Sequence, residues 1–133
     1  MATSNHRPLS PHLRIYRLPL LAKLSITHRI TGFGISLAAV LMPLVLSALA
    51  WNPSAYQCLQ AQLSTWYGRL VLVLISAGLI FHTLNGLRHL VWDTGRNLAV
   101  PNAQRSGYAV ILLTIVLTVG LWLYVCGYYR ELL

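Results

Sequence analysis

Charged residues are absent from three long stretches of the chain, residues 30–68, 70–87 and 106–129. A helix needs about 20 mainly apolar residues to cross the hydrocarbon core of a bilayer, which is about 30 Å thick. The pattern therefore predicts three membrane-spanning helices at about 25–51, 67–92 and 108–129. Neither an internal repeat nor a soluble domain interrupts them. We expect a single all-α membrane domain over residues 1–133.

Composition supports this class of protein and excludes a soluble enzyme. Hydrophobic residues make up 56% of the 133 residues and charged residues 9%, whereas an ordinary soluble domain carries about 25% charged residues. The chain has 10 Lys and Arg against 2 Asp and Glu. In a hydrophilic chain that excess would indicate a nucleic-acid partner, but between apolar spans it indicates membrane topology, and we expect no nucleic acid.

The positions of the basic residues predict the orientation of the helices. They precede the first span and surround the second connection, at Arg7, Arg14, Arg17, Lys23, Arg29, Arg88, Arg96 and Arg105. Basic flanks stay inside, so we expect an up-down-up bundle with its N-terminus inside. Prolines interrupt the segment at about 1–24, which lacks the apolar core and cleavage site of a signal peptide and has no transit-peptide character. We expect this segment to lie on the inner surface.

Two cysteines, Cys58 and Cys126, are too few for a zinc site or an iron–sulfur cluster of this chain alone. Both are expected on the outer side of the membrane. A disulfide between them is one interpretation, and two free thiols is the interpretation that we favour.

The second predicted span carries an ionisable face. Helical periodicity places His82, Gly86 and His89 on one side, with Gly78 one turn before His82. Imidazole is a common axial ligand of haem iron, and flanking glycines would leave room for the flat macrocycle. The alternative is a histidine hydrogen-bonded within a closely packed helix pair. Arg88 points about 120° away from this face and is interpreted as an anchor to lipid phosphate.

Depth restricts how a haem could be ligated. His82 lies about 15 Å from Trp92, near the middle of the membrane. His89 is about 10.5 Å from His82 along the same helix, whereas two nitrogens on opposite faces of one iron are only about 4 Å apart. His28, at the start of the first span, is too close to the inner surface. A second ligand would have to come from another chain.

The first predicted span has a polar face that starts at its inner end, where Ser25, Arg29, Gly32 and Ser36 are aligned and His28 lies beside them. A hydroxyl, an imidazole and a guanidinium at this depth suit the carbonyls of a quinone or the propionates of a haem. The alternative is a simple anchor, with Arg29 extended to lipid phosphate.

Three motifs then resemble a known family. RPLSPHLRIYR at 7–17, SITHRITG at 25–32 and HTLNGLRHLVWDTG at 82–95 are similar, in this order, to the cytochrome b556 membrane-anchor subunits of succinate dehydrogenase, respiratory complex II. The resemblance covers two of the three predicted helices. The third, with Thr114, Thr118 and Gly120, matches only in composition and is interpreted as a packing helix.

The resemblance implies a role for each matching residue. His82 would be an axial ligand of haem b, with the haem shared with a second small anchor subunit and packed near Gly78 and Gly86. Ser25 and Arg29 would line the ubiquinone site, and no residue of this chain would be catalytic in succinate oxidation. The haem propionates would lie near His28, Arg29 and His89.

The resemblance also implies a division of labour among subunits. FAD and the iron–sulfur clusters would belong to a flavoprotein and an iron–sulfur subunit, and the proline-rich run at 7–19 would contact the latter. The complex would reside in the bacterial inner membrane, or in the mitochondrial inner membrane if the chain is processed. The alternatives are a haem-free structural anchor, a quinol:fumarate reductase anchor and a small transporter subunit.

Overall fold

The computed structural model describes residues 16–131 and consists, over that range, of four helices and no strands. They are α1 (Leu20–Trp51), α2 (Pro53–Ser64), α3 (Trp66–Asp93) and α4 (Val100–Glu131). Three of them, α1, α3 and α4, are long and apolar enough to cross a membrane. The prediction of an all-α protein with three spans is confirmed. The proline-rich motif at 7–17 lies almost entirely outside the described residues.

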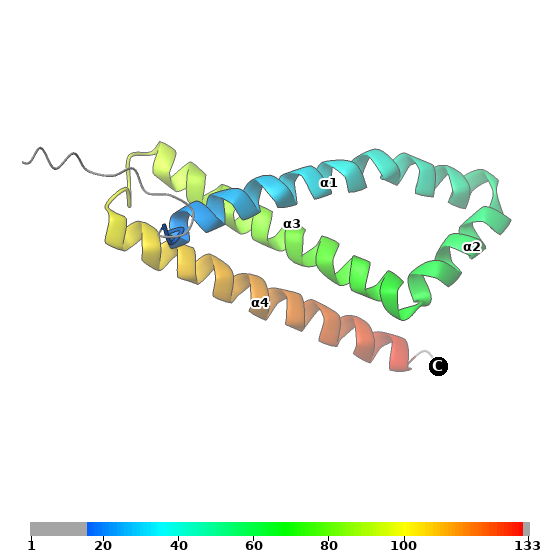
Figure 1. The fold of residues 1–133 in the computed structure, drawn as a ribbon. Coiled ribbons are helices and arrows are strands. Elements are labelled where there is room, and N and C mark those ends of the chain that lie inside the picture. Colours follow the sequence, from blue (N-terminus) through cyan, green and yellow to red (C-terminus); the bar gives the residue numbers. More distant parts are fainter. Residues whose placement is uncertain (1–15, 132–133) are drawn as a thin grey trace, which may run out of the picture.

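Figure 1 shows α3 between α1 and α4, with successive long helices running in opposite directions. At one end α1 and α4 begin and α3 ends. We call this the basic end, because Lys23, Arg96 and Arg105 lie there. At the far end α1 diverges from α3, and the short helix α2 bridges them. Pro43 lies within α1 and does not end it.

Helix α2 occupies the connection between the first two spans, for which the sequence analysis expected no element. Its start is a standard cap: the Asn52 side chain accepts a hydrogen bond from the Ala55 amide at 3.1 Å, and Pro53 takes the first helical position. Thr65 is extended and caps α3 by accepting from the Gly68 amide at 3.2 Å. Cys58 in α2 and Cys126 in α4 are both free and exposed, so the disulfide alternative is not realised.

The turn between α3 and α4 is shorter than predicted, since α4 begins at Val100 rather than near 108. Gly95 and Asn97 both have positive φ, at 77° and 59°. Glycine and asparagine adopt this conformation more readily than other residues. The turn that they form follows directly on the end of α3 at Asp93. Helix α1 also begins earlier than predicted, at Leu20, because Pro19 suits the residue that precedes a first turn.

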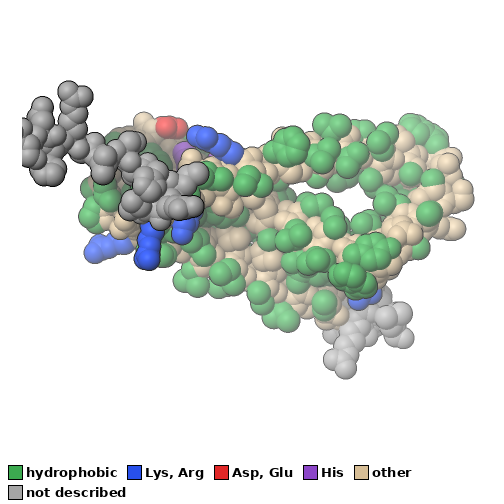
Figure 2. Space-filling model, in the orientation of Figure 1, with side chains coloured by type: hydrophobic (Ala, Val, Ile, Leu, Met, Phe, Trp, Pro, Cys, Tyr) green, Lys and Arg blue, Asp and Glu red, His purple; other side chains and the backbone are tan. Residues whose placement is uncertain are grey.

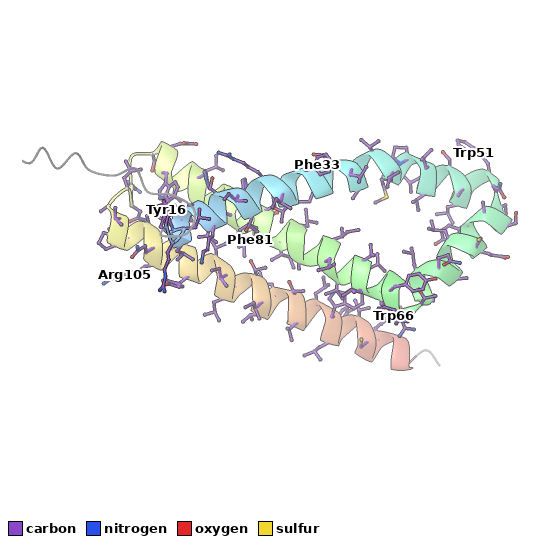
Figure 3. The ribbon with its side chains drawn as sticks, in the orientation of Figure 1. Tyr16, Phe33, Trp51, Trp66, Phe81 and Arg105 are labelled. Atoms are coloured by element: carbon purple, nitrogen blue, oxygen red, sulfur yellow. The ribbon has the colours of Figure 1, made fainter. Side chains whose placement is uncertain are left out.

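The core lies toward the basic end, where Leu24 of α1, Phe81 of α3 and Val110 of α4 are buried together. In Figure 3 Phe81 lies among the three long helices, while Phe33 and Trp51 project from α1. A Cβ at Gly107 would meet Leu24 Cδ1 at 2.7 Å, so glycine lets α1 and α4 approach here. Figure 2 shows hydrophobic side chains spread over the visible face of the helices elsewhere, as expected for helices that face lipid.

Candidate functional site

The candidate site lies between α1 and α3 in the half of the bundle nearer the basic end. Helix α1 contributes His28 and Thr31, and α3 contributes His82 and His89. We call His28, His82 and His89 the histidine cluster. The structure thus brings together two helices whose polar faces the sequence analysis could describe only separately.

His82 is held by its Nδ1 atom. This nitrogen lies 3.1 Å from the His28 carbonyl oxygen and 3.3 Å from Thr31 Oγ1. The Thr31 hydroxyl donates its own proton to a backbone carbonyl of α1, Thr27 at 2.9 Å or His28 at 3.0 Å. Its oxygen therefore accepts from His82. Both partners favour a proton on Nδ1, which leaves the lone pair on Nε2 free for a ligand.

The three imidazoles form a stack, so the expectation that His28 lies too close to the inner surface to come near His82 was wrong. The ring centroids of His28 and His82 are 3.9 Å apart with an interplanar angle of 7°, and those of His28 and His89 are 5.3 Å apart at 12°. His89 Nδ1 lies 2.7 Å from the Asn85 carbonyl oxygen. His28 Nδ1 is buried and has no hydrogen-bond partner among the described residues. His28 is therefore the centre of the cluster and keeps one polar atom unsatisfied.

Three glycines allow α1 and α3 to approach at this site. A Cβ at Gly32 would lie 2.9 Å from His82 Cε1, so glycine at this position makes room for the His82 ring. A Cβ at Gly78 would lie 3.6 Å from the methyl carbon of Thr31, and one at Gly86 would lie 4.0 Å from His28 Cε1. The two glycines that were expected to flank His82 thus lie against α1 side chains. Gly32 is the glycine in contact with the His82 ring.

Ser25 and Arg29 lie on α1 toward the basic end, separate from the histidine cluster. The Ser25 side chain is half-buried and that of Arg29 is exposed. Neither forms a hydrogen bond or ion pair with another described residue. Both polar groups are thus without a partner within the described residues.

The expectation for Arg88 was wrong. Only 7% of the residue is exposed, and the guanidinium donates to Asn85 Oδ1, Ser106 Oγ and the Ala103 carbonyl, each at 3.0 Å. It also stacks 4.0 Å above the Trp92 ring. A helical wheel gives the angle between Arg88 and His82 but cannot reveal that α4 occupies that side. Asn85, which is fully buried, was missed although it stands in the HTLNGLRH run.

This donor set fits a single axial ligand to a haem iron. No group of three or more metal-ligating side chains occurs among the described residues. His82 instead offers one nitrogen whose opposite ring nitrogen is fixed by a carbonyl and a hydroxyl, and ligand histidines in proteins are commonly oriented in this way.

These features define a class: a helical, multi-pass membrane subunit with a partly buried histidine cluster between its first two spans. Residues 3–121 match the family model described as the succinate dehydrogenase/fumarate reductase transmembrane subunit. The chain belongs to this family.

Individual proteins that are similar to this chain carry names from the same family. The chain is 41% identical over 114 residues to the succinate dehydrogenase cytochrome b556 subunit of Paracoccus denitrificans, covering 86% of this chain and 88% of the relative. It is 40% identical to the mitochondrial cytochrome b560 subunit of Sus scrofa, covering 88% and 70%. The Rickettsia felis cytochrome b556 subunit is 33% identical, covering 89% and 92%. The relatives thus include both bacterial and mitochondrial proteins.

Proposed function

We propose that this chain is the cytochrome b membrane anchor of a succinate:quinone oxidoreductase, that it holds the catalytic subunits at the membrane, and that it ligates haem b through His82 Nε2. The single observation that carries the haem assignment is the surroundings of His82 Nδ1, which lies 3.1 Å from the His28 carbonyl oxygen and 3.3 Å from a hydroxyl that already donates to a backbone carbonyl. Family membership supports the anchor role. The second axial ligand would come from a second small anchor subunit, because the other described histidines, His28 and His89, lie in one stack with His82, with nearly parallel rings and no room for a haem between them.

The residues around His82 have separate tasks in this proposal. Thr31 and the His28 carbonyl orient the ring, and Gly32 leaves room for it. His28, His89 and Arg29 would lie near the propionates, with the unsatisfied His28 Nδ1 as a donor for a carboxylate. When bound, the haem supplies a one-electron redox centre within the membrane.

Ser25 and Arg29 would form this chain's part of the ubiquinone site. The Ser25 hydroxyl can donate to a quinone carbonyl, and the Arg29 guanidinium favours the negative charge that develops as the quinone is reduced. FAD, the iron–sulfur clusters and succinate oxidation would belong to the flavoprotein and iron–sulfur partners. In this arrangement the basic end faces the inner side of the membrane, and the catalytic subunits dock there.

The test of the haem assignment is the visible spectrum of the purified complex. His82→Leu should abolish or strongly change the reduced b-type spectrum, whereas Thr83→Leu, an exposed neighbour on α3, should leave it unchanged. An unchanged spectrum in an assembled His82→Leu complex would overturn the assignment. A wild-type complex without a b-type spectrum would favour the haem-free anchor. Family membership gives no support to the transporter alternative.

The quinone assignment has its own test. In Ser25→Ala and Arg29→Ala complexes, quinone reduction should fall by about 10 to 1000-fold if each donor acts in the transition state. Succinate oxidation with a dye that takes electrons upstream of the quinone should persist. Ser36→Ala, on an exposed part of α1, is the control. Wild-type quinone kinetics in intact variants would return Ser25 and Arg29 to an anchoring role.

A further inference from the structure

Within residues 16–131, Thr31 provides the only side chain that lies within hydrogen-bond distance of a ring nitrogen of the histidine cluster. His89 Nδ1 faces a backbone carbonyl, and His28 Nδ1 has no partner in this part of the chain. We propose that Thr31 is a positioning residue whose hydroxyl sets the redox potential of the haem, because it controls how strongly His82 Nε2 donates electrons to the iron. This role rests on the haem ligation by His82 proposed above.

The first argument is the fixed direction of the Thr31 hydroxyl. Its proton is donated to a carbonyl of the same helix, that of Thr27 at 2.9 Å or that of His28 at 3.0 Å. Such a bond to the preceding turn holds a helical threonine in one χ1 rotamer. In this rotamer the hydroxyl oxygen lies 3.3 Å from His82 Nδ1. The hydroxyl is therefore a fixed acceptor for His82 and does not rotate freely.

The second argument is the position of the Thr31 methyl group. A Cβ at Gly78 would lie 3.6 Å from this methyl carbon, so the methyl group is turned toward α3 while the oxygen is turned toward His82. Valine has the same branched shape, with a second methyl group in place of the hydroxyl. Thr31→Val therefore keeps the contact with α3 and removes the acceptor, which separates the two halves of this side chain.

The third argument is the chemistry of the ring nitrogen that the hydroxyl faces. His82 Nδ1 has two acceptors, and the His28 carbonyl at 3.1 Å belongs to the backbone and stays in every variant. The Thr31 hydroxyl is the acceptor that the sequence can change. A ligand histidine becomes more basic when its other N–H group donates to an acceptor. A more basic ligand stabilises ferric over ferrous iron, so we expect Thr31 to lower the potential of the haem.

The experiment is a redox titration of the purified complex, followed by the reduced b-type absorbance. In Thr31→Val the ratio of reduced to oxidised haem at the wild-type midpoint should rise about three- to tenfold, and a tenfold rise corresponds to about 59 mV for one electron. Thr31→Ser keeps a hydroxyl and should restore most of the wild-type potential. The control is Thr118→Val, because the Thr118 hydroxyl donates only to the Thr114 carbonyl of α4 at 2.7 Å, and its potential should not change.

A second variant covers the case in which Thr31→Val does not assemble. Thr31→Ala removes the same acceptor and introduces the residue that helices tolerate best, so the same rise in potential is expected. An unchanged or lower potential in the variant that assembles, or an equal rise in Thr31→Ser, would overturn the role of Thr31 and leave haem ligation by His82 in place. A b-type spectrum that is unchanged in an assembled His82→Leu complex would overturn both.

Discussion

The half of the bundle near the basic end and the half at the far end are both rich in apolar residues, yet they are packed differently. Near the basic end α1, α3 and α4 bury the following residues: Leu24, Phe81, Asn85, Arg88, Ala103, Gly107 and Val110. In the far half Gly68 is the single buried residue of the described chain. There α1 separates from α3, with α2 between them (Figure 1).

The difference between the two halves indicates which contacts stabilise the packing of the helices. In lipid, contact between two apolar helices gains little over contact with acyl chains, so small residues and polar contacts decide where helices meet. The basic-end half has both: glycines at the α1 contacts with α3 and α4, and hydrogen bonds between α3 and α4 through Arg88 and Ser106. In the far half only the bond from Trp122 to Ser76 joins described residues of α3 and α4 by their side chains.

The largest expected difference in unfolding free energy between the two halves comes from replacing one side-chain amide in each half by leucine. Asn85→Leu removes the acceptor of Arg88 NH1 at a fully buried position. It should lower the free energy of unfolding by about 1.5–3 kcal/mol, the range for hydrogen bonds to charged groups. Gln62→Leu removes an exposed acceptor of Tyr67 and should change it by less than about 0.5 kcal/mol. SDS titration of the full chain in micelles measures both.

Asn85 Nδ2 is buried without a partner among the described residues, so leucine also removes an unsatisfied donor, and the loss should fall toward the lower end of the range. Equal losses for Asn85→Leu and Gln62→Leu would mean that the buried polar cluster does not stabilise the basic-end half.

Much of the fold could be predicted from the sequence because each span is a long run of apolar residues. Helix α2 was missed because it is too short and too polar to resemble a span. The signal was nevertheless present, since Asn52 followed by Pro53 is a strong helix start. The early start of α4 was missed because Arg105 suggested a connection, whereas the helix extends beyond its apolar part.

The residues of the candidate site could be predicted from the sequence, but the contacts between them could not. Periodicity identifies the polar face that includes His82. The stacking of His28 on His82 depends on how far α1 slides along α3, and that register is set by Thr31 and Gly32 at the helix contact. Arg88 was misassigned for the same reason, since its partners on α4 depend on where that helix docks. The sequence therefore predicts which residues share a face of a helix, whereas only the structure shows which faces pack against each other.

The next prediction compares two glycines of the far half. A Cβ at Gly68 would collide with the backbone of Gln62 and Leu63, which cannot yield as a side chain can. Gly68→Ala should therefore cost about 1–3 kcal/mol of unfolding free energy. Gly120 has open space around it, and Gly120→Ala should gain up to about 1 kcal/mol from helix propensity. Thermal unfolding followed by circular dichroism checks the opposite signs, and a cost at Gly120 would contradict its open surroundings.

The smallest expected effect concerns the bond that joins α3 to α4 in the far half. Ser76→Ala removes the acceptor of Trp122 Nε1, which lies 3.0 Å from Ser76 Oγ. Hydrogen bonds between membrane helices average about 0.6 kcal/mol, and the loss should be of that size. The control is Ser36→Ala, because Ser36 Oγ donates only to Gly32 of its own helix at 2.9 Å, and we expect almost no change. SDS titration with both variants in parallel resolves the difference. A loss from Ser76→Ala as large as that from Asn85→Leu would mean that one polar contact stabilises the far half as strongly as the buried cluster stabilises the basic-end half.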